Sequence, residues 1–323
     1  MGRRMVVVAI AMQVLAVACT SDPTPAPSRS PSVPPSPTTA ASPSPVPVSP
    51  VGVPVPATPP AGIVATTTSG DVVIIELPTL ATTTIARYPP RSQSDTPEGI
   101  VFFLSAITVT PEERILLSSC CEPAGGYVRT LNFNGRESKS PVGVGEDPEL
   151  DPSGRLVVRG DIGGLSISPV ERRRIGKAFF LTGKSGYFAA DPAWSPDSMR
   201  VAYTLRGRLY VIDTTATSIS GLAPIKSSRG TYWGPIAWTA SGLLVAEIDG
   251  RWDDQGASRI VRVDPASKTR TVLWRSGRAI TDLATSRQPA SYLWVAGGTI
   301  HWNIGGEEGS LAGSYDKAAF FPG

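Results

Sequence analysis

The clearest structural signal in this chain is the stretch PAWSPDSMRVAY, residues 192–203. An apolar segment that ends at Trp194 is followed by a polar turn, and a second apolar segment begins at Val201. Pro196 presets φ at the second position of the turn, and Asp197 can cap the turn by hydrogen bonding. The stretch therefore predicts two strands joined by a tight turn, and we assign its residues a structural role and no catalytic one.

Weaker copies of this unit occur on both sides of it, with turn-like sequences that begin at Thr110, Asp151, Thr239 and Ser286. From residue 111 through 152, 196 and 240 to 287, the copies are about 41, 44, 44 and 47 residues apart. Short segments of alternating apolar residues lie between the turns, and helical periodicity is nearly absent. A period of about 40–50 residues with about four strands is typical of a propeller blade. We therefore predict an all-β domain over 62–323, a six-bladed β-propeller, with a seven-bladed ring as the alternative.

The two ends of this domain predict how the ring closes. The first repeat, residues 62–88, has room for only three strands before the next repeat begins. The last residues, 318–323, look like the opening strand of a repeat that has no continuation. We expect the C-terminal strand to complete the first blade, because this would remove an open sheet edge.

The sequence Trp194-Ser195-Pro196-Asp197 resembles the repeat of TolB-like and WD40-like propellers. The TolB-like repeat has tryptophan, serine, proline, aspartate and glycine before an isoleucine-alanine-phenylalanine strand, and here Ser198 replaces the glycine. The resemblance is fullest in this blade, partial in three others and faint in the blade that starts near Ile280. It implies a propeller fold for the part of the chain after Gly62, and it supports this architecture better than any family function.

The start of the chain predicts export. Arg3 and Arg4 precede an apolar run over residues 5–18, which is shorter than the roughly 20 residues of a spanning helix. Residues 1–18 therefore resemble a signal peptide. Cys19 follows small residues, as in the lipobox of bacterial lipoproteins, where the cysteine thiol receives diacylglycerol. Ala16 stands where the lipobox usually has leucine, so free secretion after ordinary cleavage is the alternative.

Residues 19–61 predict a tether between the signal peptide and the propeller. Fifteen of the 32 prolines of the chain fall between Pro23 and Pro60, mixed with serine, threonine, alanine and valine. Such a composition lacks the apolar surface needed to offset the entropy of ordering, so we expect a disordered, extended segment. At about 3.1 Å per residue, some forty residues reach at most roughly 130 Å.

Composition excludes several classes of function. The net charge is +3, and the loss of Arg3 and Arg4 with a signal peptide would leave about +1, too little for the basic surface that binds nucleic acid. His301 is the single histidine, which excludes histidine-rich metal sites, and we expect it to be structural. We predict no metal site, no cofactor, no catalytic residue and no nucleic-acid partner, and we expect a monomer.

One rim of the predicted ring carries the candidate binding residues. In a propeller blade, the loop between the second and third strands lies on the same rim as the connections between blades. Aromatic side chains there offer stacking area and charged ones offer polar contacts. The predicted rim residues are Glu122, Tyr232, Trp233, Arg251, Trp252, Asp253 and Asp254.

The adjacent pair Cys120-Cys121 also falls on this predicted rim. In a chain exported to an oxidising space, and with Cys19 carrying lipid, the two remaining cysteines favour a vicinal disulfide. Two reduced thiols that fill space beside a strand are the alternative.

Together these features predict a lipoprotein anchored through Cys19 at the outer face of the bacterial cell membrane. Its propeller would be a non-catalytic binding or scaffolding module for a protein or glycan partner. The alternative is a propeller hydrolase or lyase that acts on a glycan or a similar cell-surface substrate. Asp253 and Asp254 would point to opposite sides of an extended segment, so they form no ready acid/base pair. Carboxylates that converge in the channel would favour the enzyme.

The lipid anchor can be tested with Cys19→Ala. Diacylglycerol supplies two acyl chains, which is sufficient for lasting membrane attachment. We therefore expect the variant to move from the membrane fraction to the soluble exported fraction on cell fractionation. Unchanged membrane association would contradict the anchor.

Overall fold

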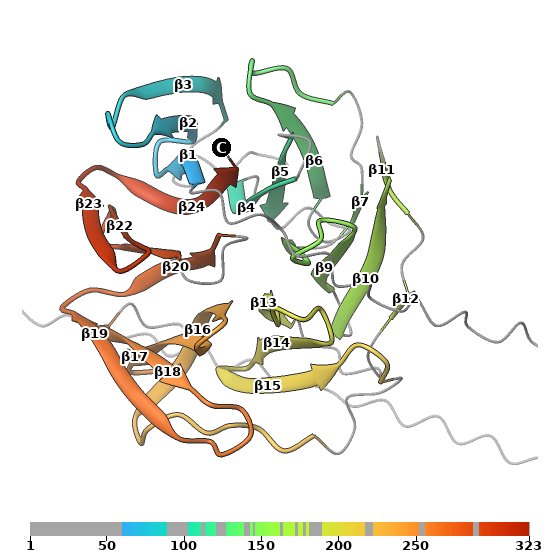
Figure 1. Ribbon diagram of the computed structural model, residues 1–323, viewed down its shortest axis with the longest axis vertical. Coiled ribbons are helices and arrows are strands. Elements are labelled where there is room, and N and C mark those ends of the chain that lie inside the picture. Colours follow the sequence, from blue (N-terminus) through green and yellow to red (C-terminus); the bar gives the residue numbers. More distant parts are fainter. Residues whose placement is uncertain are drawn as a thin grey trace, which may run out of the picture. The chain divides into compact units, whose positions relative to one another are not determined.

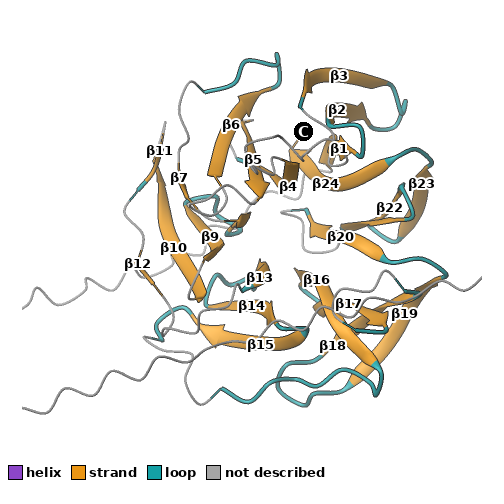
Figure 2. Cartoon of the chain, turned by 180° about the vertical axis from the view of Figure 1, so that it is seen from behind, coloured by secondary structure: helices purple, strands orange, loops and turns teal. Residues whose placement is uncertain are grey.

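The computed structural model describes residues 60–88, 103–110, 114–120, 127–138, 143–144, 146–161, 164–171, 174–176, 179–180, 189–216, 222–251, 256–286 and 291–322. The chain divides into two compact units, Met1–Val48 and Ser49–Gly323, and every described residue belongs to the second unit. The described residues form strands, turns and loops (Figure 2), and no helix among them is long and apolar enough to cross a membrane.

The described strands form six antiparallel sheets (Figure 1). One sheet holds both the first and the last strand, in the order β24 (Tyr315–Pro322), β1 (Pro60–Thr67), β2 (Asp71–Glu76) and β3 (Thr82–Arg87). The next sheet has β4 (Phe103–Val109), β5 (Arg114–Cys120), β6 (Tyr127–Asn132) and β7 (Gly143–Val144). The third has β8 (Glu146–Leu150), β9 (Leu156–Asp161), β10 (Gly164–Glu171) and β11 (Arg174–Ile175), with β12 (Phe179–Phe180) also paired to β10.

The remaining sheets follow in chain order. The fourth has β13 (Ala190–Trp194), β14 (Arg200–Leu205) and β15 (Arg208–Asp213). The fifth has β16 (Thr231–Thr239), β17 (Gly242–Asp249), β18 (Ser258–Val263) and β19 (Arg270–Ser276). The sixth has β20 (Ile280–Thr285), β21 (Tyr292–Ala296), β22 (Thr299–Ile304) and β23 (Glu307–Leu311).

The sheets are arranged around a common centre. The strands β24, β4, β8, β13, β16 and β20 lie innermost, and each of them contacts the next around the centre (Figure 1). This radial arrangement of antiparallel sheets is that of a β-propeller. The prediction of an all-β propeller is therefore confirmed.

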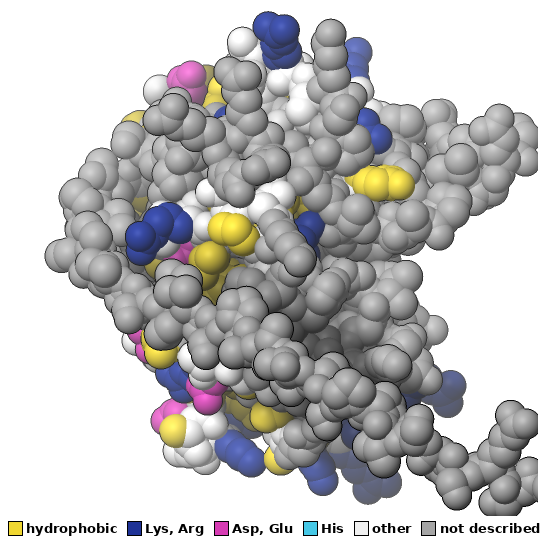
Figure 3. All heavy atoms as spheres, turned by 90° about the vertical axis from the view of Figure 1, so that its right-hand side faces the viewer, with side chains coloured by type: hydrophobic (Ala, Val, Ile, Leu, Met, Phe, Trp, Pro, Cys, Tyr) yellow, Lys and Arg dark blue, Asp and Glu magenta, His cyan; other side chains and the backbone are white. Residues whose placement is uncertain are grey.

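The hydrophobic core lies between neighbouring sheets. Leu243 and Val245 of β17 belong to a cluster shared with Leu209 of the fourth sheet. Leu244, which alternates with them, packs instead with Trp294 of the sixth sheet. Because both faces of a sheet are buried, its central strand reads as a continuous apolar run. At the surface shown in Figure 3, the coloured hydrophobic side chains stand in small separate groups.

The turn that dominates the sequence analysis has the expected structural role. The hydroxyl group of Ser195 bonds to Asp197 at 2.5 Å, and the carboxylate of Asp197 accepts the N–H of Met199 at 3.0 Å. Ser198 has a φ of 58°, in the left-handed region, which is where the TolB-like repeat has glycine. Its hydroxyl group donates to Asp151 at 3.1 Å, so the turn bonds to its own copy in the preceding sheet.

The strand count differs from four in two of the sheets. The third sheet has five described strands, and the fourth has three. Beside β15, the outermost described strand of the fourth sheet, Ile225 forms an isolated bridge with Leu209. Its amide N–H donates to the Leu209 carbonyl at 2.8 Å, so this connecting segment covers a small part of the β15 edge.

The last strand pairs with the first. In this antiparallel pair, Phe321 of β24 lies opposite Gly62 of β1, and Phe320 opposite Ile63. A Cβ atom at Gly62 would collide with the ring of Phe321 and with the carbonyl oxygen of Ile75. The absence of a side chain at Gly62 therefore permits the observed packing of β24.

We expect Gly62→Ala to lower the free energy of unfolding by about 1–3 kcal/mol, because overpacking strains the backbone and the Phe321 ring. Urea denaturation measures the change. Gly277→Ala is the matched control, since a Cβ atom there meets nothing within 4 Å and the stability should change by less than about 0.5 kcal/mol. Equal stability of the two variants would contradict the close packing of β24 on β1.

Candidate functional site

The structure describes only part of the predicted binding rim. Tyr232, Trp233 and Arg251 are among the described residues. Cys120 is the last residue of β5, and its side chain lies outside the described part. The predicted residues that lie wholly outside it are Cys19, Cys121, Glu122, Trp252, Asp253 and Asp254.

The expectation of an exposed stacking surface at Trp233 needs correction. Only 1% of Trp233 is exposed, because β16 turns its ring into the core between the fourth and fifth sheets. Its indole N–H donates to the carbonyl oxygen of Ile225 at 2.8 Å. Tyr232 is partly buried and packs against the cluster on the other face of the sheet, and Arg251 is exposed after β17. Of these three, Arg251 is the side chain that the structure exposes most.

The innermost strand of every sheet carries a β-bulge. The registers shift between Leu104 and Ala106, Glu146 and Glu149, Ala190 and Ala193, Trp233 and Ile236, and Ile280 and Asp282, and β24 is bulged at Asp316 opposite Thr66 and Thr67. A bulge inserts an unpaired residue and redirects side chains. At two of these bulges, Asp147 and Asp191 have φ values of 47° and 49°. The bulges of β8 and β13 therefore carry acidic residues in the left-handed conformation.

Hydrogen bonds join bulges of neighbouring sheets. Asp191 donates its backbone N–H to the carboxylate of Asp147 at 3.4 Å, which links β13 to β8. Asp282 of β20 accepts the N–H of Ala318 of β24 at 2.6 Å. The ammonium group of Lys317 donates to the carbonyl oxygen of Thr281 at 2.8 Å and lies 3.8 Å from the Asp282 carboxylate. These contacts join β13 to β8 and β24 to β20.

We define the channel cluster as Asp147, Glu149, Asp191, Asp282 and Lys317. Burial raises the pKa of Glu149 to about 8, and the Asp282 charge adds to this rise. Burial and then Asp147 raise the pKa of Asp191 to about 7, and burial raises the pKa of Asp282 to about 6 although Lys317 opposes the shift. Burial also raises the pKa of Asp147. For Lys317, burial disfavours the charge, but the surrounding carboxylates hold its pKa above the usual value.

The channel cluster can therefore hold protons near neutral pH. Carboxyl groups with a raised pKa can donate protons as acids, and in this channel they also bond to the backbone of neighbouring strands. Among the described residues, no group of three or more histidine, cysteine, aspartate or glutamate side chains is placed to hold a metal ion.

The channel cluster is not among the predicted sites, and the chain carries only a weak signal for it. Asp-Pro occurs at 147–148 and 191–192, and Gly-Pro at 234–235. Each of these pairs sits at a bulge of an inner strand, where proline is tolerated because the inserted residues make no ladder hydrogen bond. Asp-Pro also occurs at 151–152 and 264–265, where turns begin, so the dipeptide alone indicates neither a bulge nor that the aspartates meet at one centre.

Comparisons with known proteins identify the fold and no family. Neither protein-family models nor curated proteins match the sequence. A chain in the crystal structure of a nidogen/laminin complex is similar, with a TM-score of 0.55 and 10% sequence identity over 80% of this chain and 97% of that one. TolB from Acinetobacter baumannii has a TM-score of 0.52 and 13% identity over 81% of this chain and 66% of its own. The TolB-like propeller architecture is thereby confirmed, and at such identities the likeness concerns the fold alone.

The raised pKa of Glu149 predicts a pH-dependent stability. The folded-state pKa of about 8 lies above the usual value of 4.5, so the stability that this group contributes is complete at low pH and is lost as pH rises through about 8. Glutamine imitates the protonated acid, so Glu149→Gln should unfold at a higher temperature than the wild type at about pH 9 and at a similar temperature at about pH 4. Each pKa unit removed corresponds to about 1.4 kcal/mol.

The matched control is Glu307→Gln on the exposed strand β23, which should leave the pH profile unchanged. Thermal unfolding followed by circular dichroism across this pH range measures both variants. A Glu149→Gln profile parallel to that of the wild type would contradict the proton-holding role of Glu149.

Proposed function

We propose that this protein is an exported lipoprotein whose propeller is a non-catalytic binding or scaffolding module. Residues 1–18 act as the signal peptide, Cys19 carries the lipid, and residues 19–61 hold the propeller away from the membrane surface. The partner is a protein or a glycan of the cell envelope. A similar fold occurs in the nidogen/laminin complex, which is an assembly of proteins, and this favours a protein partner.

We also infer that the ring has six blades and is closed by the last strand. Two observations support this. Six sheets are described, and their inner strands contact one another in the circular order β4, β8, β13, β16, β20 and β24. The pairing of β24 with β1 joins the two ends of the domain in one blade, so the edge of β1 is not left unpaired.

The observation that carries the binding proposal is that the carboxylates of the channel cluster bond to other residues of the chain. Asp282 is engaged by the Ala318 N–H and by Lys317, and Asp147 accepts the N–H of Asp191. Asp191 itself accepts the hydroxyl group of Thr204 at 3.4 Å. A general acid or base must reach the proton of a substrate, whereas these groups hold inner strands together. This supports a structural role for these carboxylates and the proposal that recognition occurs on the rim.

The proposed binding rim includes all of the predicted rim residues except Trp233. Arg251 and Tyr232 belong to blade five, and Trp252, Asp253 and Asp254 follow in the same loop. On blade two, Glu122 and the vicinal disulfide Cys120-Cys121 belong to the proposal. Trp233 does not, because its ring is buried.

An enzyme that cleaves a glycan is the second candidate. It is favoured by one observation, which is that carboxyl groups with raised pKa values converge on Lys317 in the channel. In this reading Asp191 or Glu149 would be the acid. The two candidates differ in what happens to the partner, because an enzyme changes it and a binding module does not.

The test is photo-crosslinking in intact cells from position Arg251, with position Glu307 on β23 as the control. We expect a covalent adduct with an envelope component from position 251 and none from position 307. The adduct should persist when Asp191→Asn is added, and mass spectrometry should find the partner chemically intact. No adduct from position 251 would contradict the rim proposal. Cleaved partner that becomes intact in Asp191→Asn would establish the enzyme instead.

A further inference from the structure

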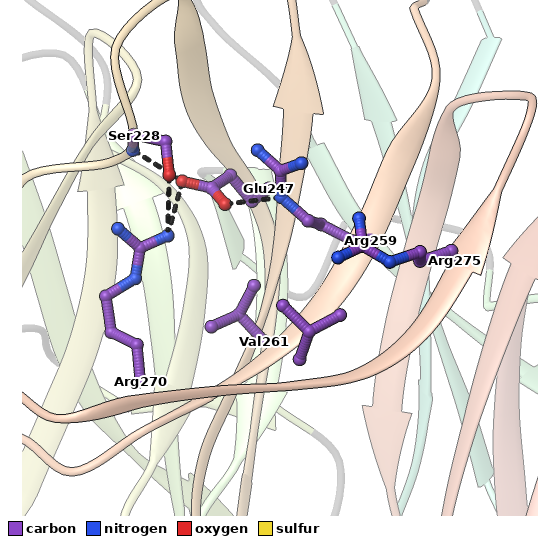
Figure 4. A pocket seen from close by; sticks show the side chains of 7 residues that line it. Ser228, Glu247, Arg259, Val261, Arg270 and Arg275 are labelled. Carbon is purple, nitrogen blue, oxygen red and sulfur yellow. Dashed lines mark hydrogen bonds and ion pairs between the residues drawn. The ribbon is translucent and has the colours of Figure 1, made fainter.

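A cavity of about 380 Å³ lies on one face of the fifth sheet (Figure 4). Its volume falls in the range of small-molecule sites, roughly 300–1,000 Å³. Its walls come from the segment before β16 and from strands β17, β18 and β19. The lining residues are Ser228, Glu247, Arg259, Val261, Arg270, Val272 and Arg275.

Glu247 holds several of the side chains that line this cavity in place by hydrogen bonds. Only 1% of its side chain is exposed, and its carboxylate accepts the guanidinium Nε–H of Arg259 at 2.6 Å. It also bonds to the guanidinium group of Arg270, to the backbone N–H of Ser228, and to the hydroxyl group of Thr231 at 3.0 Å. Burial would raise the pKa of Glu247, but these hydrogen bonds hold it at about 2. The carboxylate is therefore ionised at all ordinary pH values, and both of its oxygens accept hydrogen bonds.

The two arginines held by Glu247 keep donors for a ligand. A guanidinium group has five N–H donors. Arg259 uses Nε on Glu247 and lies 3.6 Å from Asp249 through Nη2. Arg270 uses Nη2 on Glu247 and Ser228, and its guanidinium carbon lies 4.7 Å from the centre of the Trp233 ring. Their remaining N–H groups are fixed in direction before any ligand arrives, which lowers the entropy lost on binding.

Arg275 supplies the third positive charge. It lies directly opposite Arg259 in the β18–β19 pair, and Figure 4 shows the two side chains next to each other. Like charges directly opposite each other on neighbouring strands destabilise a sheet. Within the described part of the chain, no hydrogen bond or ion pair to Arg275 is found that would offset this repulsion. An anion shared by the two arginines would offset it.

The cavity also offers an apolar surface. Val272 of β19 lies opposite the buried Val261 of β18, and 42% of Val272 is exposed. Val272 and Met199 are the only exposed large hydrophobic side chains among the described residues. Three arginines against Glu247 leave the lining with a formal charge of +2, so a ligand that fits this cavity has an acidic group and a small organic body.

We propose that this cavity binds a small organic acid, with its carboxylate or phosphate group held by Arg259, Arg270 and Arg275 and its body against Val272. Guanidinium groups bind both kinds of oxyanion through two parallel hydrogen bonds. An acidic sugar has the required size and composition. The inference deepens the proposed binding function and rests on it, because β17 and β18 lead directly into the blade-five rim loop that follows Arg251.

The test is isothermal titration of the full chain, purified in detergent, with glucuronate, glucose 6-phosphate, inorganic phosphate and neutral glucose. We expect one of the two sugar acids to bind, the other to bind more weakly, and glucose not to bind. The preferred acid identifies carboxylate or phosphate as the recognised group. Binding of glucose as tight as that of the acids, or no binding of either acid at about 10 mM, would overturn the proposal. Inorganic phosphate binding as tightly as the sugar acids would overturn the role of the apolar surface.

Arg275→Gln is the decisive variant, because Arg275 is exposed and stands apart from the Glu247 hydrogen bonds, so its loss should not disturb folding. Removing a charge-assisted contact should weaken binding of the preferred acid about tenfold or more. Arg136→Gln, which removes the same charge from an exposed position after β6, should leave the affinity unchanged. Equal affinity of the Arg275→Gln protein and the wild type would overturn the assignment.

The two proposals fail separately. If the acid binds but position 251 gives no crosslink, the cavity is a ligand site and the rim proposal is wrong. If position 251 crosslinks and Arg275→Gln does not affect binding of any acid, the rim proposal stands and the cavity assignment is wrong.

Discussion

Burial of both faces of every sheet is the constraint on which the rest of this structure depends. A sheet with two buried faces must exchange side chains with two neighbours, as Leu244 and Val245 do in opposite directions. Polar groups then lie mainly at the edges of the sheets and at the strand ends, and a polar group on a buried face, such as Glu247, is hydrogen-bonded. At the centre, where the inner edges come together, Lys317 lies among Asp147, Asp191 and Asp282.

The bulges of the inner strands follow from this crowding at the centre. A bulge leaves backbone groups without a partner in its own sheet. On β13 and β24 a neighbouring blade supplies a partner, because the Asp147 carboxylate accepts the N–H of Asp191 and the Asp282 carboxylate accepts the N–H of Ala318. Burial is the main cause of the raised pKa values of these carboxyl groups; at Asp191 the Asp147 charge adds to it, and at Asp282 Lys317 opposes it.

The cavity on the fifth sheet has the opposite electrostatic character. Burial raises the pKa of Glu149 and would raise that of Glu247, but hydrogen-bond donors surround Glu247 and hold its pKa low. A buried carboxylate that accepts several hydrogen bonds fixes the arginine side chains that donate to it. Each of these guanidinium groups still has N–H donors that the carboxylate does not use. A buried glutamate thus retains a proton at the centre of the propeller, whereas in the fifth sheet a buried glutamate is ionised and holds arginine side chains in place.

Local sequence patterns were sufficient to predict the all-β propeller, its repeat of about 44 residues and the structural role of the PAWSPD turn, because strands and turns depend on neighbouring residues. The meeting of Asp147, Asp191, Asp282 and Lys317, the burial of Trp233, and the assembly of Arg259, Arg270 and Arg275 around Glu247 depended on the tertiary structure. Each of these joins residues from different strands, and register, bulges and the packing of blades set such distances, which the spacing along a chain does not contain.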